Sequence, residues 1–198
     1  MIKEKMMTYN HMAPPFEFNG FENLTKQEAK TYFKWFEGQK NDRIIYLQEY
    51  IKNSNVSISL DYTPESLIPL WEWYEKKIVF VNKSIEEIEK QKEETAEFIH
   101  PYLRQTKLSN ETAAICMDVA IYFAEVFVQN NETLKWGCIT DRKAHADANR
   151  PVILGFIKRM NLNPFRVVDV CTLRSEREKE KDRLYNVYSR WSQYIAEK

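Results

Sequence analysis

The strongest pattern of hydrophobic positions lies at residues 109–130, where apolar side chains occupy nearly every angle of a helical projection. Ser109 precedes this segment, and a serine hydroxyl there can accept a hydrogen bond from a free amide at a helix start. A helix that is apolar all round is expected inside a fold. The pattern therefore predicts that residues 109–130 form the central buried helix.

The polar exceptions within this segment fall on one narrow face. Glu111, Asp118 and Glu125 are spaced by seven residues, close to two helical turns. Asp118 and Glu125 then lie roughly 10 Å apart along the axis, too far for a tight catalytic pair, and the Glu-x-x-His pattern of di-iron bundles is absent. We expect a polar seam that faces water or pairs with Arg or Lys of a neighbouring helix, and we keep both acids as candidate binding residues.

Upstream stripes of apolar residues with helical spacing predict further helices. Residues 25–28 (TKQE) match a capping box at a helix start, and Gly38 is expected to end or bend this helix before another at 42–52. The alternating residues 56–60 fit a short strand or an extended linker. An irregular N-terminal segment, residues 1–24, is expected to dock through its phenylalanines: Phe16, Phe18 and Phe21.

Two more helix starts precede residue 100. Thr63 and Pro64 predict a cap followed by a first helical proline, with Pro69 kinking or delaying the helix. Residues 84–87 (SIEE) form a second capping box, which opens a charged surface helix reaching about Ile99.

Beyond residue 130 the apolar pattern changes. Residues 134–140 and 151–158 predict two short strands, and a helix begins near Pro164. Residues 174–183 are wholly polar or charged before an apolar stripe resumes at Leu184. One long helix with a solvated middle and two helices with a hinge both fit this pattern.

These elements predict a mainly α fold: a helical bundle with a central buried helix and a small antiparallel two-stranded β ribbon. The scarcity of glycine, four residues, also favours helices over an all-β fold. We expect one domain over residues 1–198, with possible sub-halves at 1–82 and 83–198.

Composition narrows the classes of function. Lys+Arg and Asp+Glu both number 29, so a net charge of zero gives no general attraction to nucleic acid or anionic membranes. No membrane span is indicated, and the charged N-terminus lacks an apolar signal core, which predicts a cytoplasmic protein. The three cysteines form no CxxC pair, and we expect neither disulfides, nor a metal site, nor another cofactor.

The polar connection at residues 141–150 is the second candidate site. It places Asp141, His145, Asp147 and Arg150 near Trp136. His145 and an aspartate could serve as base and orienter, and Cys138 with His145 is the nearest Cys-His pair in the chain. A binding loop and an ordinary surface loop fit the same residues, and no nucleotide-binding, hydrolase or metalloprotease motif is present.

The strings DVAIYFAEVFVQNN, LKWGCIT, NRPVILGF and NPFRVVDV resemble a pattern found in uncharacterised proteins of low-GC Gram-positive bacteria. The matching residues are Tyr122, Phe123, Glu125, Trp136, Pro151, Gly155, Asn163, Pro164 and Phe165. The resemblance implies no particular activity. Some compact proteins of this kind are similar in type to immunity proteins, which bind and neutralise a toxin.

Three functions follow as expectations. The first is a non-enzymatic protein-binding module, immunity-like by analogy, that uses Asp118, Glu125, Trp136 and the 141–150 loop. The second is an enzyme of unrecognised type, for example a hydrolase, that uses the 141–150 loop with Asp141, His145 and Asp147 at its site. The third is a scaffold that forms a homodimer through its C-terminal helix.

Overall fold

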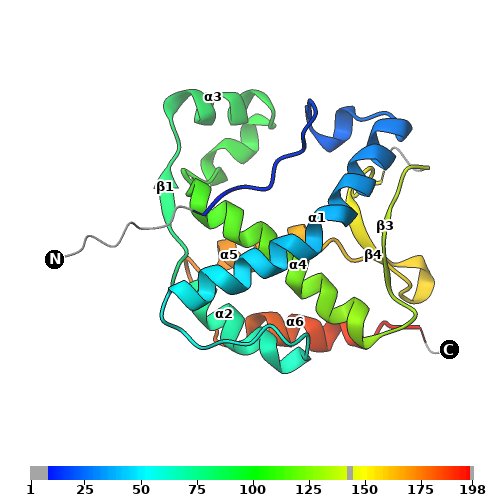
Figure 1. Ribbon diagram of the computed structural model, residues 1–198. Coiled ribbons are helices and arrows are strands. Elements are labelled where there is room, and N and C mark those ends of the chain that lie inside the picture. Colours follow the sequence, from blue (N-terminus) through cyan, green and yellow to red (C-terminus); the bar gives the residue numbers. More distant parts are fainter. Residues whose placement is uncertain (1–8, 142–144, 197–198) are drawn as a thin grey trace.

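A computed structural model describes residues 9–141 and 145–196 and has a mainly α architecture (Figure 1). The α-helices are α1 (Lys26–Asn53), α2 (Leu67–Glu75), α3 (Ile85–Glu93), α4 (Asn110–Asn130), α5 (Pro164–Arg174) and α6 (Arg183–Ser192). The strands are β1 (Phe80–Asn82), β2 (Thr106–Leu108), β3 (Lys135–Cys138) and β4 (Pro151–Leu154). Short 3-10 helices occur at η1 (Phe21–Asn23), η2 (Pro64–Ser66), η3 (Glu97–Tyr102) and η4 (Ile157–Arg159).

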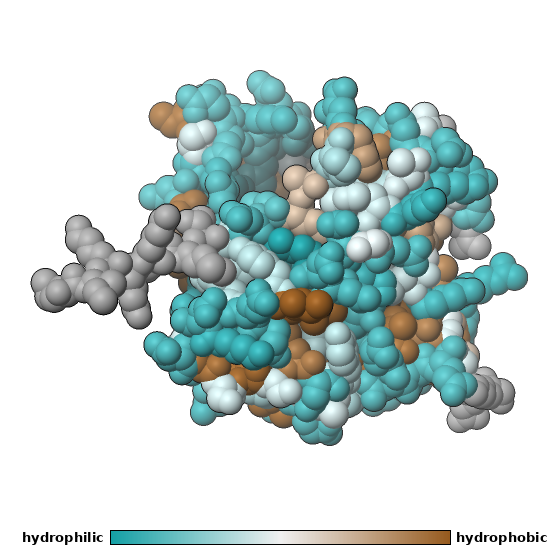
Figure 2. All heavy atoms as spheres, viewed as in Figure 1, coloured by the Kyte–Doolittle hydropathy of each residue, from teal (hydrophilic) through white to brown (hydrophobic). Residues whose placement is uncertain are grey.

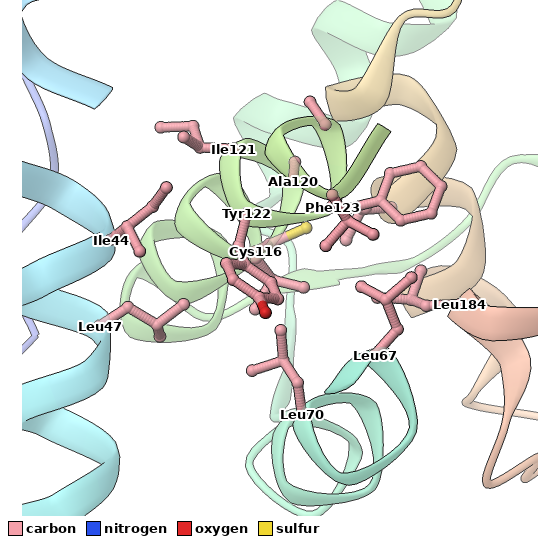
Figure 3. Close-up of a cluster of buried hydrophobic side chains, with 14 of the residues drawn as sticks. Ile44, Leu47, Leu67, Leu70, Cys116, Ala120, Ile121, Tyr122, Phe123 and Leu184 are labelled. Carbon is pink, nitrogen blue, oxygen red and sulfur yellow. The ribbon is translucent and has the colours of Figure 1, made fainter. Parts of the chain in front are cut away.

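The hydrophobic core forms where other helices pack against α4. Fourteen of the 21 residues of α4 are buried, and α1, α2 and α5 all contact it. Figure 3 shows Ile44 of α1, Leu67 of α2 and Leu184 of α6 pointing toward the α4 side chains. Burial of this apolar surface is the main force that holds the helices together.

Helix α1 is one continuous helix, so the prediction that Gly38 would separate two helices is wrong. A glycine inside a helix costs about 1 kcal/mol relative to alanine. Residues on both sides of Gly38 anchor α1 to other elements: Phe36 packs on Trp136 of β3 and Phe165 of α5, and Lys40 pairs with Glu125 of α4. This packing outweighs the local cost.

Other helix boundaries also differ from the sequence pattern. Helix α3 ends at Glu93 instead of near Ile99, and a 3-10 helix that contains Pro101 follows it. Helix α2 begins at Leu67, after the 3-10 helix η2, so of the two alternatives for Pro69 the delayed helix start is confirmed. Pro69 lies in the first turn, where backbone amides have no intrahelical acceptor. The Thr63 hydroxyl donates to Asp61 and caps no helix.

The linker at residues 56–60 and the C-terminal helical region each had two possible structures. Residues 56–60 form an extended linker without strand pairing. The C-terminal part is two helices, α5 and α6, because residues 175–182 between them are not an α-helix. Both segments are held by distant residues: Gln48 of α1 bonds to the backbone of Ile58 and Leu60, and Trp71 of α2 donates to the Glu180 carbonyl oxygen.

The predicted antiparallel ribbon is present as β3 and β4, paired from Lys135 with Leu154 to Cys138 with Pro151. Gly155 follows β4 with φ of 111°, and a Cβ there would lie 2.0 Å from the Thr133 carbonyl oxygen. Only glycine fits this close approach between backbone segments. A second ribbon, β1 with β2, was not predicted.

Two further segments shape the surface. The strap, residues 9–24, crosses the molecule before α1, while the arm, residues 80–108, runs from β1 through α3 and η3 to β2 (Figure 1). No residue of α3 or η3 is buried. Within the described ranges, no helix is both long and apolar enough to cross a membrane.

Candidate functional site

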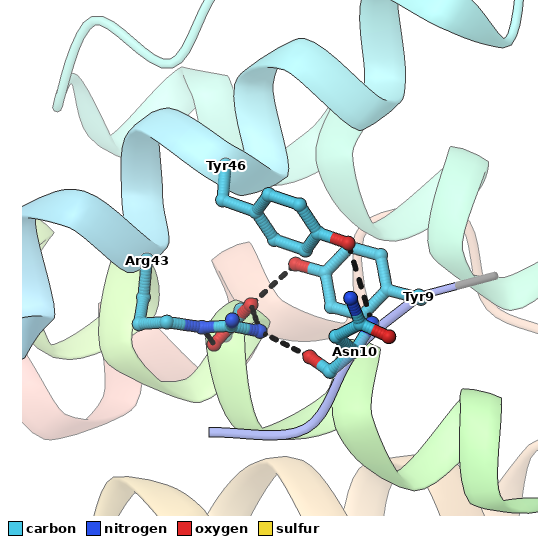
Figure 4. A network of polar contacts seen from close by, with 5 residues as sticks. Tyr9, Asn10, Arg43 and Tyr46 are labelled. Carbon is cyan, nitrogen blue, oxygen red and sulfur yellow. Dashed lines mark hydrogen bonds and ion pairs between the residues drawn. The ribbon is translucent and has the colours of Figure 1, made fainter. Parts of the chain in front are cut away.

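Asp118 of α4 is fully buried and joins α4 to α1 and the strap. Arg43 of α1 donates from Nε to Asp118 Oδ1 at 3.0 Å and from Nη2 to Oδ2 at 2.6 Å. The Tyr9 hydroxyl donates to the same carboxylate. Figure 4 shows Arg43 also reaching the carbonyl oxygen of Asn10, at 2.8 Å, while the Asn10 amide donates to the Tyr46 hydroxyl.

Burial raises the pKa of the Asp118 carboxyl above its ordinary value, and the hydrogen bonds from Arg43 and Tyr9 oppose that rise. Burial and the nearby Asp118 charge likewise raise the pKa of the Tyr9 hydroxyl. A buried carboxylate is tolerated only when cations and donors compensate its lost hydration. This cluster therefore fastens the N-terminal end of the strap to α1 and α4.

Glu125 lies two turns further along α4 and is bound in the same manner. Lys40 Nζ of α1 and Trp136 Nε1 of β3 each lie 2.7 Å from Glu125 Oε1, and Gln129 donates to Oε2 at 3.2 Å. The indole nitrogen of Trp136 thus finds its partner inside the molecule, as buried tryptophans usually do.

Of the two alternatives for the polar seam, the structure therefore shows pairing with a neighbouring helix and not exposure to water. Asp118 pairs with Arg43, and Glu125 pairs with Lys40, both of α1. Asp118, Glu125 and Trp136 are buried, and their polar side-chain atoms bond within the chain. A binding role for these three residues stays a prediction, and it would have to act through the residues that cover them.

The described part of the 141–150 loop is fastened by its own side chains, while residues 142–144 lie outside the described residues. The Asp147 carboxylate is buried and accepts from Asn161 at 3.0 Å and Asn163 at 2.8 Å. Asn149 donates to the carbonyl oxygens of Phe21 and Leu24, both at 3.0 Å. The loop therefore holds the C-terminal end of the strap.

Asp141 and His145 line a small hollow of about 240 Å³ with Arg159 and Asn161. Asp147 is not part of that lining, although its backbone amide donates to His145 Nδ1 at 3.1 Å. Among the described residues, no cluster of three or more His, Cys, Asp or Glu side chains could hold a metal ion. The structure thus brings together two of the three residues expected in a hydrolytic site.

A second cavity, which we call the strap pocket, measures about 390 Å³ and lies beneath the strap. Its apolar lining consists of Met12 and Phe21 of the strap, Tyr32 of α1, Met117 of α4, Pro151 of β4 and Phe165 of α5. Its polar lining is Arg150, Asn163, Arg166 and Asp169. A mainly apolar concave site with a few converging polar groups is the usual form of a ligand pocket.

A third cavity, the arm cleft, measures about 790 Å³ between the end of the arm and α5. Tyr102 and Arg104 line it from the arm, and Val170, Arg174 and Arg177 line it from the other side. Arg104 pairs with Glu176 and donates to the Leu173 carbonyl oxygen at 3.3 Å. Tyr102 is 85% exposed.

The apolar stripe of α6 packs inside the chain. The Tyr188 ring lies 4.4 Å from Phe127, and the Trp191 ring lies 5.2 Å from Phe156, measured between centroids. Leu184 is buried, whereas Tyr194 is 43% exposed. A homodimer through the C-terminal helix stays a prediction, and little of this stripe remains free for it.

Of the residues around the strap pocket and the arm cleft, only Arg150 was a candidate from sequence. Arg166 and Asp169 sit three residues apart on α5 and therefore share a face, which is a signal that sequence alone contains. Arg174 and Arg177 belong to the mixed-charge run 174–183, a pattern that usually indicates a solvated surface and so did not point to a binding site. Ser175 and Arg183 of the same run are buried.

Comparison with protein-family models, curated proteins and solved structures found no match to this chain.

Proposed function

We propose that this chain is a non-enzymatic, cytoplasmic protein-binding module and that the arm cleft receives its partner. The observation that carries this proposal is the grouping of exposed Tyr102 with three arginines in one concave surface. Tyrosine and arginine are the residue types most enriched among those that dominate binding energy in protein interfaces.

The charged residues that line the arm cleft indicate what kind of surface its partner presents. The Arg104 guanidinium is already paired with Glu176, whereas the side chains of Arg174 and Arg177 pair with no described residue. Free guanidinium groups favour carboxylates, which they can bind in bidentate fashion. The partner is therefore a protein that presents acidic side chains beside one apolar anchor, which packs on Tyr102 and Val170.

The face drawn in Figure 2 offers no broad apolar patch that would compete with the arm cleft as a docking surface. Figure 2 shows hydrophobic residues on this face as several separate spots within a mostly hydrophilic surface. The arm exposes several large apolar residues, most strongly Ile85, Phe98 and Tyr102 and to a lesser degree Val81 and Ile99. Scattered apolar residues are normal on protein surfaces, so specificity must come from the shape and charge of the cleft.

The experiment compares the full-length chain with two variants of the cleft, Tyr102→Ala and the double variant Arg174→Glu with Arg177→Glu. Proteins captured from native lysate are identified, produced in pure form and titrated against each chain. We expect Tyr102→Ala to weaken the purified complex by at least about 30-fold, the range of an interface hot spot. We expect the double variant to abolish the salt-dependent part of the association rate.

Arg190→Glu is the matched control, because Arg190 is an exposed arginine on α6 outside the cleft lining. The proposal is wrong if no captured protein binds in pure form, or if the cleft variants bind as tightly as the control. An immunity-like role is the special case in which the partner is a toxin, and it predicts that the purified partner loses toxicity on binding.

The enzymatic alternative and the homodimer alternative are tested separately. A hydrolytic site at Asp141 and His145 is favoured only by their shared hollow, and it predicts loss of a detectable hydrolase activity in His145→Ala. A dimerising scaffold predicts twice the chain mass in sedimentation, reduced by Tyr194→Glu. We also infer that α4 is the central helix of the bundle, supported by its packing against α1, α2 and α5.

A further inference from the structure

We propose that the strap pocket binds a small acid with an apolar, ring-sized body and a single carboxylate. This site is separate from the arm cleft, so the inference does not depend on the proposed protein partner. It rests on the lining of the pocket, on two arginines with free hydrogen-bonding capacity, and on one unpaired acid.

The apolar lining suits a ring. The Phe21 and Tyr32 rings meet edge to face with centroids 4.9 Å apart, and Phe165 of α5 adds a third ring to the lining. Met12 and Met117 complete this surface, and methionine adapts its flexible side chain to ligands of different shape. The volume of about 390 Å³ lies within the usual range for small-molecule pockets.

The two arginines retain donors for a ligand. The closest ion-pair contacts are 3.8 Å for Arg150 Nη2 with Glu22 and 3.8 Å for Arg166 Nη1 with Asp147. Both distances exceed a hydrogen bond, so neither guanidinium is saturated by its neighbour. The Arg150 guanidinium also stacks on the Phe21 ring, at 4.6 Å from the centroid, which orients it beside the apolar lining.

Asp169 limits the charge of the ligand. It lines the same pocket from α5, one turn beyond Arg166, and its carboxylate forms no hydrogen bond or close ion pair with a described residue. Partial desolvation raises the pKa of Asp169, and the charge on Arg104 opposes that rise. An unpaired carboxylate repels a second negative charge, so the site favours a monocarboxylate over a dicarboxylate or a phosphate ester.

The test is a titration of the full-length, isotope-labelled chain with 3-phenylpropanoate, followed by amide chemical shifts in NMR spectra. We expect saturable shifts in the strap around Phe21 and in α5 around Asp169. Arg166→Gln should weaken binding by about tenfold, the loss expected for a hydrogen bond to a charged group. Asp169→Asn should strengthen binding several-fold, since it removes the opposing charge.

Arg190→Gln serves as the matched control and should leave the dissociation constant unchanged. Arg150→Gln is measured as well, but Arg150 also holds Phe21, so Arg166→Gln decides the outcome if the strap loosens. The same chemistry occurs at the C-terminal residue of a peptide. Acetyl-Ala-Ala-Phe is therefore titrated in parallel, and whichever probe binds more tightly identifies the source of the carboxylate.

Three results would overturn the proposal. The first is the absence of saturable shifts with either carboxylate. The second is equal binding of 3-phenylpropanamide, which has the same ring but no charge, because the arginines would then contribute nothing. The third is tighter binding of phenylsuccinate, whose second carboxylate Asp169 should repel.

Discussion

Replacing Arg43 with methionine should destabilise the protein strongly at neutral pH. Methionine keeps an unbranched side chain next to the Tyr46 ring but removes two of the three donors that hold the buried Asp118 carboxylate. Breaking one partner of a buried ion pair typically costs 3–5 kcal/mol. Because the Arg43 side chain is 13% exposed, we expect the lower end, about 3 kcal/mol.

The pH dependence of the unfolding free energy tests whether the loss of stability comes from the buried charge of Asp118. Burial holds the pKa of Asp118 above its ordinary value of 3.8, so this group favours the folded state most at low pH and less as pH rises through the folded pKa. Loss of Arg43 removes an influence that lowers this pKa and raises the folded value further. The difference in unfolding free energy between wild type and Arg43→Met should therefore shrink as pH falls from neutral toward the raised pKa of Asp118.

The assay is urea unfolding followed by circular dichroism and tryptophan fluorescence at several pH values. A loss of about 3 kcal/mol corresponds to a fall in melting temperature of roughly 6–12 °C for a chain of this size. Arg190→Met controls for the loss of an exposed arginine. The double variant Arg43→Met with Asp118→Asn should be more stable than Arg43→Met alone, because it buries no uncompensated charge.

A loss below about 1 kcal/mol, the size expected of an exposed ion pair, would refute this account of the cluster. A loss that grows toward acidic pH would refute the assignment to Asp118.

Three further substitutions test the packing. Gly38→Ala should raise the unfolding free energy by about 0.5–1 kcal/mol in denaturant titrations, because the site is helical and the added Cβ would meet no atom within 4 Å apart from the adjoining helix backbone. Gly155→Ala should lower it by about 2 kcal/mol or more, since φ of 111° and the Thr133 carbonyl oxygen oppose a side chain; an unchanged melting temperature would contradict this. Trp136→Phe removes the donor to Glu125 and should cost about 1–2 kcal/mol in thermal melts, whereas a neutral result would mean that water replaces the indole.

Features that depend on neighbours along the chain were predictable. Both capping boxes, at Thr25 with Glu28 and at Ser84 with Glu87, are present as the sequence indicates. Ser109 accepts from the Thr112 amide at the start of α4. These contacts close within three residues, so the local sequence contains all of the participating groups.

The candidate sites were only partly predictable. The seam was expected from the spacing of Asp118 and Glu125, but its partners were not identified, because Arg43 lies 75 residues from Asp118 and Lys40 lies 85 from Glu125. The strap pocket draws its lining from the strap, α1, α4, β4 and α5. No periodicity relates such distant segments to one another.

The sequence alone determined where most helices begin, that α4 is apolar with one acidic face, and that a ribbon follows it, because hydrophobic periodicity and capping are local properties. Tertiary structure decided that α1 runs through Gly38, that α5 and α6 are separate, and which cations neutralise the buried acids. The physical reason is that these outcomes depend on free energies gained between residues far apart in the chain, which exceed the local preferences of about 1 kcal/mol that a sequence pattern records.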